Sequence, residues 1–253
     1  MRLDGSFQSA YKELEARFKE RADADKRVYL PSPEPEGPVD YVFICWEPSL
    51  RGWARDEKEA QQKVDAGFRN FLAGIETSIL HFCIQHDLCT QRYHITDLSK
   101  GVMKVGDAKD DRCQRWNQWY PLLEKELKLV APDAVTVAVG NEVYDYLRSK
   151  GLDGLRTVMK VMHYSNQAGR KRNEEAMKLG FQEFSEEVRD SVLNEVIATA
   201  KALLMRHMPT MWEERLKMLE NKRLTPSRQK LISVYKSQFE SIRARTNRKA
   251  QGG

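Results

Sequence analysis

A short apolar run that ends at a glutamate and a proline most constrains the fold of this chain. Residues 42–45 read Val-Phe-Ile-Cys and are followed by Trp46, Glu47 and Pro48. Such a run suits a strand that is buried on both faces, as in a parallel sheet. Proline cannot continue the ladder, so the strand ends here with Glu47 at its carboxyl end, the edge where open α/β sheets bind ligands. Taken alone, the stretch is better explained by an ordinary acid that faces water.

Three further segments, at 93–96, 134–139 and 157–161, read as strands, and 134–139 is the clearest of them. Helical periodicity between and after them predicts helices at 7–24, 68–82, 111–130, 142–149, 185–208 and 210–221, and a last one that begins near Pro226. Residues 50–63 read as a polar loop. Strands that alternate with helices predict an α/β protein, here a three-layer α/β/α fold with a central four-stranded parallel sheet and a helical C-terminal extension.

The domain organisation follows from composition along the chain. Residues 1–38 are expected to form an N-terminal helix and a proline-rich linker, residues 39–208 the α/β domain, and residues 209–253 a basic helical extension whose tail, 243–249, is disordered. Residues 201–253 contain 13 Lys and Arg against 4 Glu. Such a segment suits a polyanionic partner, although a solvated helix face explains it as well.

Bulk composition excludes several classes of protein. A hydrophobic content of 41% and a charged content of 31% are typical of a soluble globular chain, and no apolar run is long enough to span a membrane or form a signal peptide. The four cysteines, at 45, 83, 89 and 113, show no metal or cluster spacing. We therefore expect a cytoplasmic monomer with reduced cysteines and without a metal ion or cofactor.

Three polar residues follow three of the predicted strands. Glu47, Asp97 and His163 each lie at or just past a strand's carboxyl end. Parallel strands place these ends on one edge, so the three side chains are expected to converge. Singly, Asp97 is explained by a turn and His163 by an ordinary loop histidine. Their joint occurrence favours a functional site.

The order of these motifs resembles the uracil-DNA glycosylase superfamily. The matching pieces, spread over about residues 39–170, are Cys45-Trp46-Glu47-Pro48-Ser49, Ile95-Thr96-Asp97, Leu127 through Pro132 to Gly140-Asn141, and His163-Tyr164-Ser165. The resemblance implies an enzyme that flips a nucleotide out of DNA and hydrolyses its N-glycosidic bond without a metal.

The resemblance also implies roles for single residues. Glu47 would position water or stabilise the positive sugar, and His163 would stabilise the departing base anion. Asp97 takes the position that reads the base, and Phe68 would stack on it, with Phe71 and Trp53 as competitors. The residues expected to contact DNA are Ser49, Ser165, Asn166, Arg170 and Lys171.

Departures from the family pattern bear on the substrate. Cys45 stands where glycine is usual, and Trp46 replaces a smaller or polar residue. Asp97 replaces the asparagine of uracil-reading branches. An ionised aspartate only accepts hydrogen bonds, which disfavours the O4 of uracil and suits the N4 amino group of cytosine. A buried Asp97 with a raised pKa would instead donate to O4 and read uracil.

These observations favour a DNA glycosylase that acts on a non-standard, cytosine-type base, in repair or in defence against modified foreign DNA. One alternative is a nucleic-acid-binding protein that kept the fold and lost catalysis, which Cys45 and Trp46 favour and which Glu47 and His163 together oppose. An enzyme of free nucleosides is a third interpretation, which the basic C-terminal segment disfavours.

Overall fold

The computed structural model describes residues 5–251, apart from the side chains of residues 109, 166 and 248–251. The chain divides into two compact units. The first unit comprises residues up to Asn70, Arg92–Ala138 and Glu142–Val158, and the second comprises Phe71–Gln91, Val139–Asn141 and the residues from Met159 onward. The predicted boundaries at 38/39 and 208/209 stay predictions.

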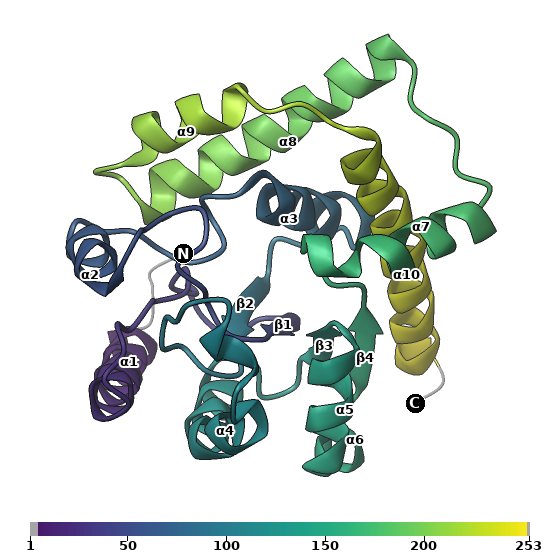
Figure 1. Cartoon of the computed structure of the whole chain (residues 1–253). Coiled ribbons are helices and arrows are strands. Elements are labelled where there is room, and N and C mark those ends of the chain that lie inside the picture. Colours follow the sequence, from purple (N-terminus) through teal and green to yellow (C-terminus); the bar gives the residue numbers. More distant parts are fainter. Residues whose placement is uncertain (1–4, 252–253) are drawn as a thin grey trace. The chain divides into compact units, whose positions relative to one another are not determined.

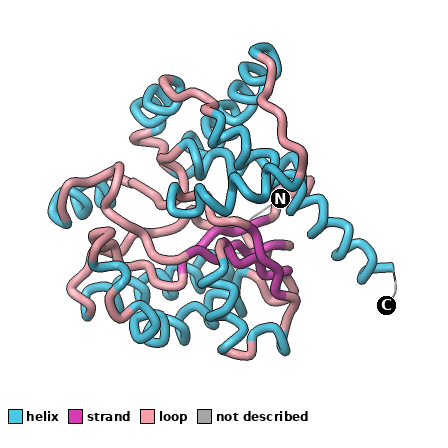
Figure 2. Tube along the Cα trace, turned by 45° about the vertical axis from the view of Figure 1, so that its right-hand side comes forward, coloured by secondary structure: helices cyan, strands magenta, loops and turns pink. Residues whose placement is uncertain are grey.

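Four parallel strands form the sheet, in the order β2-β1-β3-β4 (Figures 1 and 2). The strands are β1 (Tyr41–Cys45), β2 (Tyr93–Asp97), β3 (Val135–Val139) and β4 (Val158–Val161). All four lie where the sequence places them, to within one or two residues. The predicted class, a three-layer α/β/α fold with a central four-stranded parallel sheet and a helical C-terminal extension, is confirmed.

The strand register explains why the apolar runs are continuous. Tyr41 pairs with Tyr93 and Val135, and Cys45 pairs with Asp97. Residues 42–45 of β1 are buried throughout, because the central strand has a neighbour on each side and side chains packed on both faces. The strand order reverses at β1, so its carboxyl end lies at the switch point of the sheet.

Helices α1 (Gly5–Ala24), α4 (Arg112–Val130) and α5 (Asn141–Ser149) cover one face of the sheet within the first unit. One cluster of buried side chains joins them to the strands, and its members include Tyr11, Val42, Ile44, Trp116, Leu127, Ala138 and Leu147. These residues recur at helical spacing in the helices and at alternate positions in β1. Pro121 lies within α4 without ending it.

The shorter helices of the first unit are α2 (Glu57–Asp65), α6 (Leu152–Leu155) and the 3-10 turn η1 (Asp107–Lys109). Residues 50–63 were expected to form a polar loop, and α2 corrects that prediction. Asp56 caps this helix by accepting a hydrogen bond from the Glu59 backbone N–H at 2.8 Å. Only Ala60 is buried in α2, which explains why its apolar periodicity was too weak to detect.

The second unit is helical apart from its part of the sheet. It contains α3 (Ile75–Asp87), the 3-10 turn η2 (Asn166–Ala168), α7 (Gly169–Lys178), α8 (Glu186–His207), α9 (Trp212–Glu220) and α10 (Pro226–Gln251). Helix α3 packs against α8 and α10, α7 against α10, and α8 against α9. The mostly polar helix α7 was not predicted.

Two expectations about helix limits are wrong. The helix predicted at 68–82 begins only at Ile75, because Gly67 and Phe71 both adopt positive φ angles, of 102° and 63°, which no α-helix accommodates. Residues 243–249 were expected to form a disordered tail, but α10 continues to Gln251. Its buried residues Leu231, Tyr235, Phe239 and Ile242 recur at helical spacing, and no glycine or proline interrupts the helix after Pro226.

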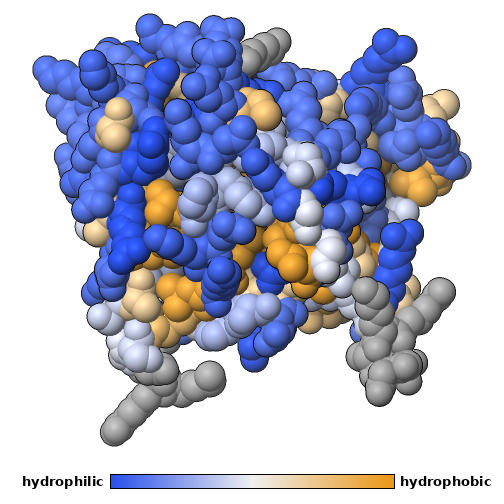
Figure 3. Space-filling model, turned by 90° about the horizontal axis from the view of Figure 1, so that it is seen from below, coloured by the Kyte–Doolittle hydropathy of each residue, from blue (hydrophilic) through white to orange (hydrophobic). Residues whose placement is uncertain are grey.

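The surface in Figure 3 is mostly hydrophilic, with small hydrophobic areas between polar residues. The large apolar side chains most exposed to solvent are Leu155 and Met177. Within the described part of the chain, no helix combines the length and the apolar composition that crossing a membrane requires.

Candidate active site at the carboxyl ends of the strands

The first unit places Glu47 and Asp97 at the ends of two paired strands. Asp97 lies opposite Cys45 in the register of β1 and β2, and Glu47 follows two residues later. The pairing continues beyond the strands, because the Leu98 N–H donates to the Cys45 carbonyl oxygen at 2.9 Å. The Glu47 charge acts on Asp97 and raises its pKa. The structure therefore places Glu47 and Asp97 at the carboxyl ends of neighbouring strands. His163, the third residue expected to converge there, belongs to the second unit, and its convergence stays a prediction.

Two side chains of α4 hold Glu47. Arg112 donates from Nε to Oε1 of Glu47 at 2.9 Å, and its Nη2 lies 2.8 Å from the same oxygen as an ion pair. Trp116 donates from Nε1 to Oε2 at 2.9 Å. Arg115 lies 3.9 Å from Oε1. The Glu47 side chain is only 2% exposed. Glu47 is thus a bound, buried carboxylate, which corrects the view of a strand-end acid that faces water.

The charge state of Glu47 reflects opposing influences. Burial raises its pKa, whereas Arg112, the hydrogen bond from Trp116, and Arg115 lower it, and the net result is above the ordinary value. Arg112 also pairs with Glu142 at the start of α5 and lies over the ring of Trp46 at 4.9 Å. Arg112 was not predicted from the sequence, where the available signal was its position one helical turn before Trp116.

Asp97 is 3% exposed and accepts a hydrogen bond at Oδ2 from Nδ2 of Asn70 at 2.6 Å. Burial raises its pKa to about 8, with Lys100 acting against that rise and Glu47 adding to it. The carboxyl group is therefore mainly protonated at neutral pH. The cytosine-type prediction assumes an ionised, acceptor-only aspartate, which the raised pKa disfavours at neutral pH. The identity of the base stays a prediction. At neutral pH, the raised pKa favours the other alternative, in which a protonated Asp97 donates a hydrogen bond.

A buried ionic network lies along β2 and the turn that follows it. Lys100 and His94 both contact the Glu126 carboxylate, at 3.1 and 3.0 Å, and Thr96 donates to it at 3.0 Å. Burial alone would raise the pKa of Glu126, but Lys100 and His94 lower it to about 2. The network fixes the segment that carries Asp97.

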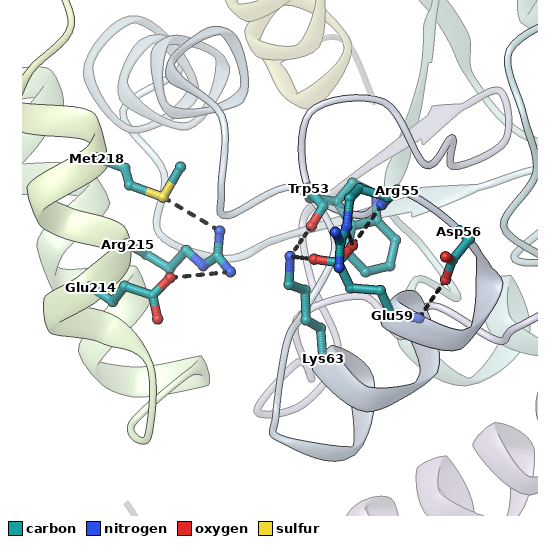
Figure 4. A network of polar contacts seen from close by, with 8 residues as sticks. All are labelled: Trp53, Arg55, Asp56, Glu59, Lys63, Glu214, Arg215 and Met218. Atoms are coloured by element: carbon teal, nitrogen blue, oxygen red, sulfur yellow. Dashed lines mark hydrogen bonds and ion pairs between the residues drawn. The ribbon is translucent and has the colours of Figure 1, made fainter.

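Phe68 stacks on Trp53 in the first unit, with ring centroids 4.5 Å apart and planes 8° from parallel. Lys63 donates to the Trp53 carbonyl oxygen and pairs with Glu59 at 2.7 Å, as Figure 4 shows. The Trp53 indole N–H donates to the Ser49 carbonyl oxygen at 2.6 Å. The predicted stacking residue Phe68 and its competitor Trp53 therefore form one rigid pair. Phe71, the other competitor, belongs to the second unit.

The second unit contains the predicted histidine motif. His163 is 8% exposed, and its Nδ1 accepts a hydrogen bond from the Ser165 backbone N–H at 3.0 Å. When the ring is neutral, this bond leaves its proton on Nε2. His163 can thus donate a hydrogen bond from Nε2, the property needed to stabilise a developing anion.

Arg172 supports this motif from α7. Its guanidinium group donates to the carbonyl oxygens of Tyr164 at 2.9 Å and Ser165 at 2.8 Å, and to Oγ of Ser227 at 2.9 Å. Arg172 is 1% exposed. Its neighbours Arg170 and Lys171 were predicted to contact DNA, whereas Arg172 was missed, because periodicity gave no sign that one of three adjacent cations is buried.

The predicted DNA contacts have different surroundings. Arg170 is exposed and pairs with Glu174 at 3.1 Å, and Lys171 is exposed on α7. Ser49 and Ser165 are half-buried. The side chain of Asn166 lies outside the described residues. Their contacts with DNA stay predictions.

The second unit has another buried arginine, Arg215 of α9. It contacts Glu214 at 3.6 Å and the sulfur of Met218 at 3.5 Å (Figure 4). Among the described residues, no three His, Cys, Asp or Glu side chains are grouped to hold a metal ion. Comparison of the sequence with protein-family models and with curated proteins finds no match.

Proposed function

We propose that this chain is a DNA glycosylase that hydrolyses the N-glycosidic bond of a flipped-out base. The observation that carries the proposal is the pair of buried carboxyl groups, Glu47 and Asp97, at the ends of two paired parallel strands. Both have raised pKa values. Buried acids with perturbed pKa values at the ligand-binding edge of an α/β sheet are typical of functional sites.

In the proposed reaction, water adds to C1′ of the deoxyribose as the bond from C1′ to the base nitrogen breaks. The base leaves with the bonding electrons, and the proton released by water neutralises the base anion. Glu47 would stabilise the positive sugar and orient the water, and the Nε2–H of His163 would stabilise the negative base. Glu47 belongs to the first unit and His163 to the second, so the role of each is proposed separately. A double-mutant cycle on the excision rate tests whether the two residues act in one reaction.

Asp97 would read the Watson–Crick edge of the base in a pH-dependent way. Its protonated form both donates and accepts, as an amide does, and suits a base with a 4-oxo group. Its ionised form only accepts and suits a 4-amino group. A cytosine-type substrate is therefore proposed for the ionised enzyme above about pH 8. DNA as partner, a monomeric state, a cytoplasmic location and a role in repair or defence belong to the same proposal.

A non-catalytic DNA-binding protein is the second candidate, and one observation favours it. Both oxygens of Glu47 already accept hydrogen bonds, from Arg112 and Trp116. A carboxylate offers about four lone-pair positions, and these two hydrogen bonds together with the ion pair to Arg112 occupy much of the group. For catalysis, water has to use a remaining position or Arg112 has to move.

Incubation with single- and double-stranded DNA containing uracil, cytosine or modified cytosines, followed by alkali, separates the two candidates. A glycosylase leaves abasic sites that alkali converts to strand breaks, and Glu47→Gln abolishes most of them. Binding without breaks in any substrate, from pH 6 to pH 9, identifies the non-catalytic protein.

A further inference from the structure

Asn70 is the only described residue whose side chain forms a hydrogen bond with the Asp97 carboxyl group. Its backbone N–H donates to the Pro31 carbonyl oxygen at 2.9 Å, which fixes the chain two residues after Phe68. The 2.6 Å distance from Nδ2 to Oδ2 is short for such a bond. Asn70 thus has a defined position from which it acts on Asp97.

The hydrogen bond makes the two oxygens of Asp97 chemically different. An amide N–H bonds best to the carbonyl oxygen of a carboxylic acid, since the hydroxyl oxygen is the weaker acceptor. In the protonated group, Oδ2 is therefore the carbonyl oxygen and Oδ1 carries the proton. Without Asn70 the proton can reside on either oxygen.

We propose that Asn70 is a specificity-determining residue, which sets whether the Asp97 atom offered to a base donates or accepts a hydrogen bond. This inference rests on the proposed function, in which Asp97 reads the base. With Oδ2 engaged by Asn70, the base meets Oδ1, and the hydrogen on that atom selects a carbonyl over an amino group at the same ring position. Replacing Asn70 by a residue without a hydrogen-bond donor would remove the preference for one base and would retain cleavage of the N-glycosidic bond.

Isosteric substitutions can fix whether the atom of residue 97 that faces the base donates or accepts a hydrogen bond. In Asp97→Asn, Asn70 still donates, so the new side-chain oxygen replaces Oδ2 and its NH₂ group faces the base as a permanent donor. In the exchanged pair Asn70→Asp/Asp97→Asn, residue 97 has to donate to residue 70, and its carbonyl oxygen faces the base as a permanent acceptor. Both proteins carry asparagine at position 97, so only residue 70 differs between them.

The experiment measures single-turnover excision of uracil and cytosine from otherwise identical single-stranded DNA between pH 6 and pH 9. Asp97→Asn should prefer uracil at least tenfold at every pH, and the exchanged pair should prefer cytosine at least tenfold, because the disfavoured base leaves a buried polar contact unsatisfied. Asn70→Leu should lose most of the wild-type preference. The same ratio in Asp97→Asn and in the exchanged pair would overturn the proposal.

A binding measurement keeps this test separate from the test of catalysis. DNA with 2′-fluoro-deoxyuridine or 2′-fluoro-deoxycytidine resists cleavage, so its affinity reports base selection even if the protein lacks glycosylase activity. The role of Asn70 is supported if the ratio of the affinities for the uridine and cytidine analogues is inverted between Asp97→Asn and Asn70→Asp/Asp97→Asn. Equal ratios refute it, whereas absent excision with inverted affinity ratios refutes only the catalytic proposal.

Discussion

Arg112 and Glu47, 65 positions apart in the sequence, form a hydrogen-bonded ion pair at the end of β1. The guanidinium group directs Nε and Nη2 at one carboxylate oxygen, and the Glu47 side chain is almost fully removed from solvent. Burial raises the pKa of this carboxyl group, and Arg112 is the strongest of the influences that lower it. Any function of Glu47 depends on this pair.

Replacing Arg112 should destabilise the protein, because the Glu47 carboxyl group stays buried without its arginine partner. We expect Arg112→Ala to lower the free energy of unfolding by about 3 kcal/mol at pH 7, because it leaves a buried carboxylate without its ion pair. The pKa of Glu47 should rise further. Chemical denaturation and an NMR titration of the Glu47 carboxyl carbon measure the two effects. Glu142→Gln removes only the exposed partner of Arg112 and should cost less than about 1 kcal/mol.

The raised pKa of Asp97 predicts a pH-dependent stability. Its folded-state pKa is about 8, against about 3.9 in an unfolded chain, so the folded state binds more protons between these values. This group therefore makes the protein less stable as pH rises from about 4 to 8. Asp97→Asn should increase stability relative to wild type progressively over that interval. A stability difference that does not vary with pH would show that Asp97 ionises normally.

The buried pair of Lys100 and Glu126 makes a third prediction. Lys100→Met should lower the free energy of unfolding by about 3–5 kcal/mol, since it leaves the buried Glu126 carboxylate without its lysine partner. Lys100→Met/Glu126→Gln removes both charges and should be clearly more stable than the single variant. Urea denaturation of the four proteins of this cycle gives the coupling energy, and simple additivity would contradict the ion-pair account.

DNA binding by the basic C-terminal segment needs a test that leaves the fold intact. Deletion of residues 222–253 is unsuitable, because α10 contributes buried Leu231, Tyr235 and Phe239 to the second unit. Lys236→Gln/Arg245→Gln removes two exposed cations of that helix. For duplex DNA, the log–log salt slope should fall by about 0.9 for each phosphate that the variant no longer neutralises. Lys12→Gln/Lys19→Gln, on exposed positions of α1, is the matched control and should leave the slope unchanged.

The helices and strands that could be predicted from the sequence are those whose buried side chains form a clear apolar pattern. Strands β1 and β3 could be found because Val42, Phe43 and their counterparts form almost continuous apolar runs, which are typical of buried strands of this length. Strands β2 and β4 gave a weaker signal, because His94 and Lys160 interrupt their apolar residues. The polar helix α7 and the weakly buried α2 have no such pattern. Phe68 was assigned to a helix because spacing alone does not reveal the positive φ angle of Phe71.

The candidate site was predictable only in part. Glu47 and Asp97 could be placed together, because parallel strands share their carboxyl edge. Arg112, Asn70 and Arg172 escaped prediction, since each reaches its partner from a segment distant in sequence or from beneath the surface. The protonation of Asp97 depends on burial, which the sequence left open between two alternatives.

Single-turnover excision by wild type and Glu47→Gln on the DNA panel is the most direct test of the proposed function. We expect wild type to form abasic sites in at least one substrate and Glu47→Gln to form them about 10²–10³ times more slowly, because one preorganised electrostatic group is removed. His163→Ala should show a comparable loss. Both variants should retain DNA binding and cooperative unfolding. Equal rates for wild type and Glu47→Gln would contradict the account.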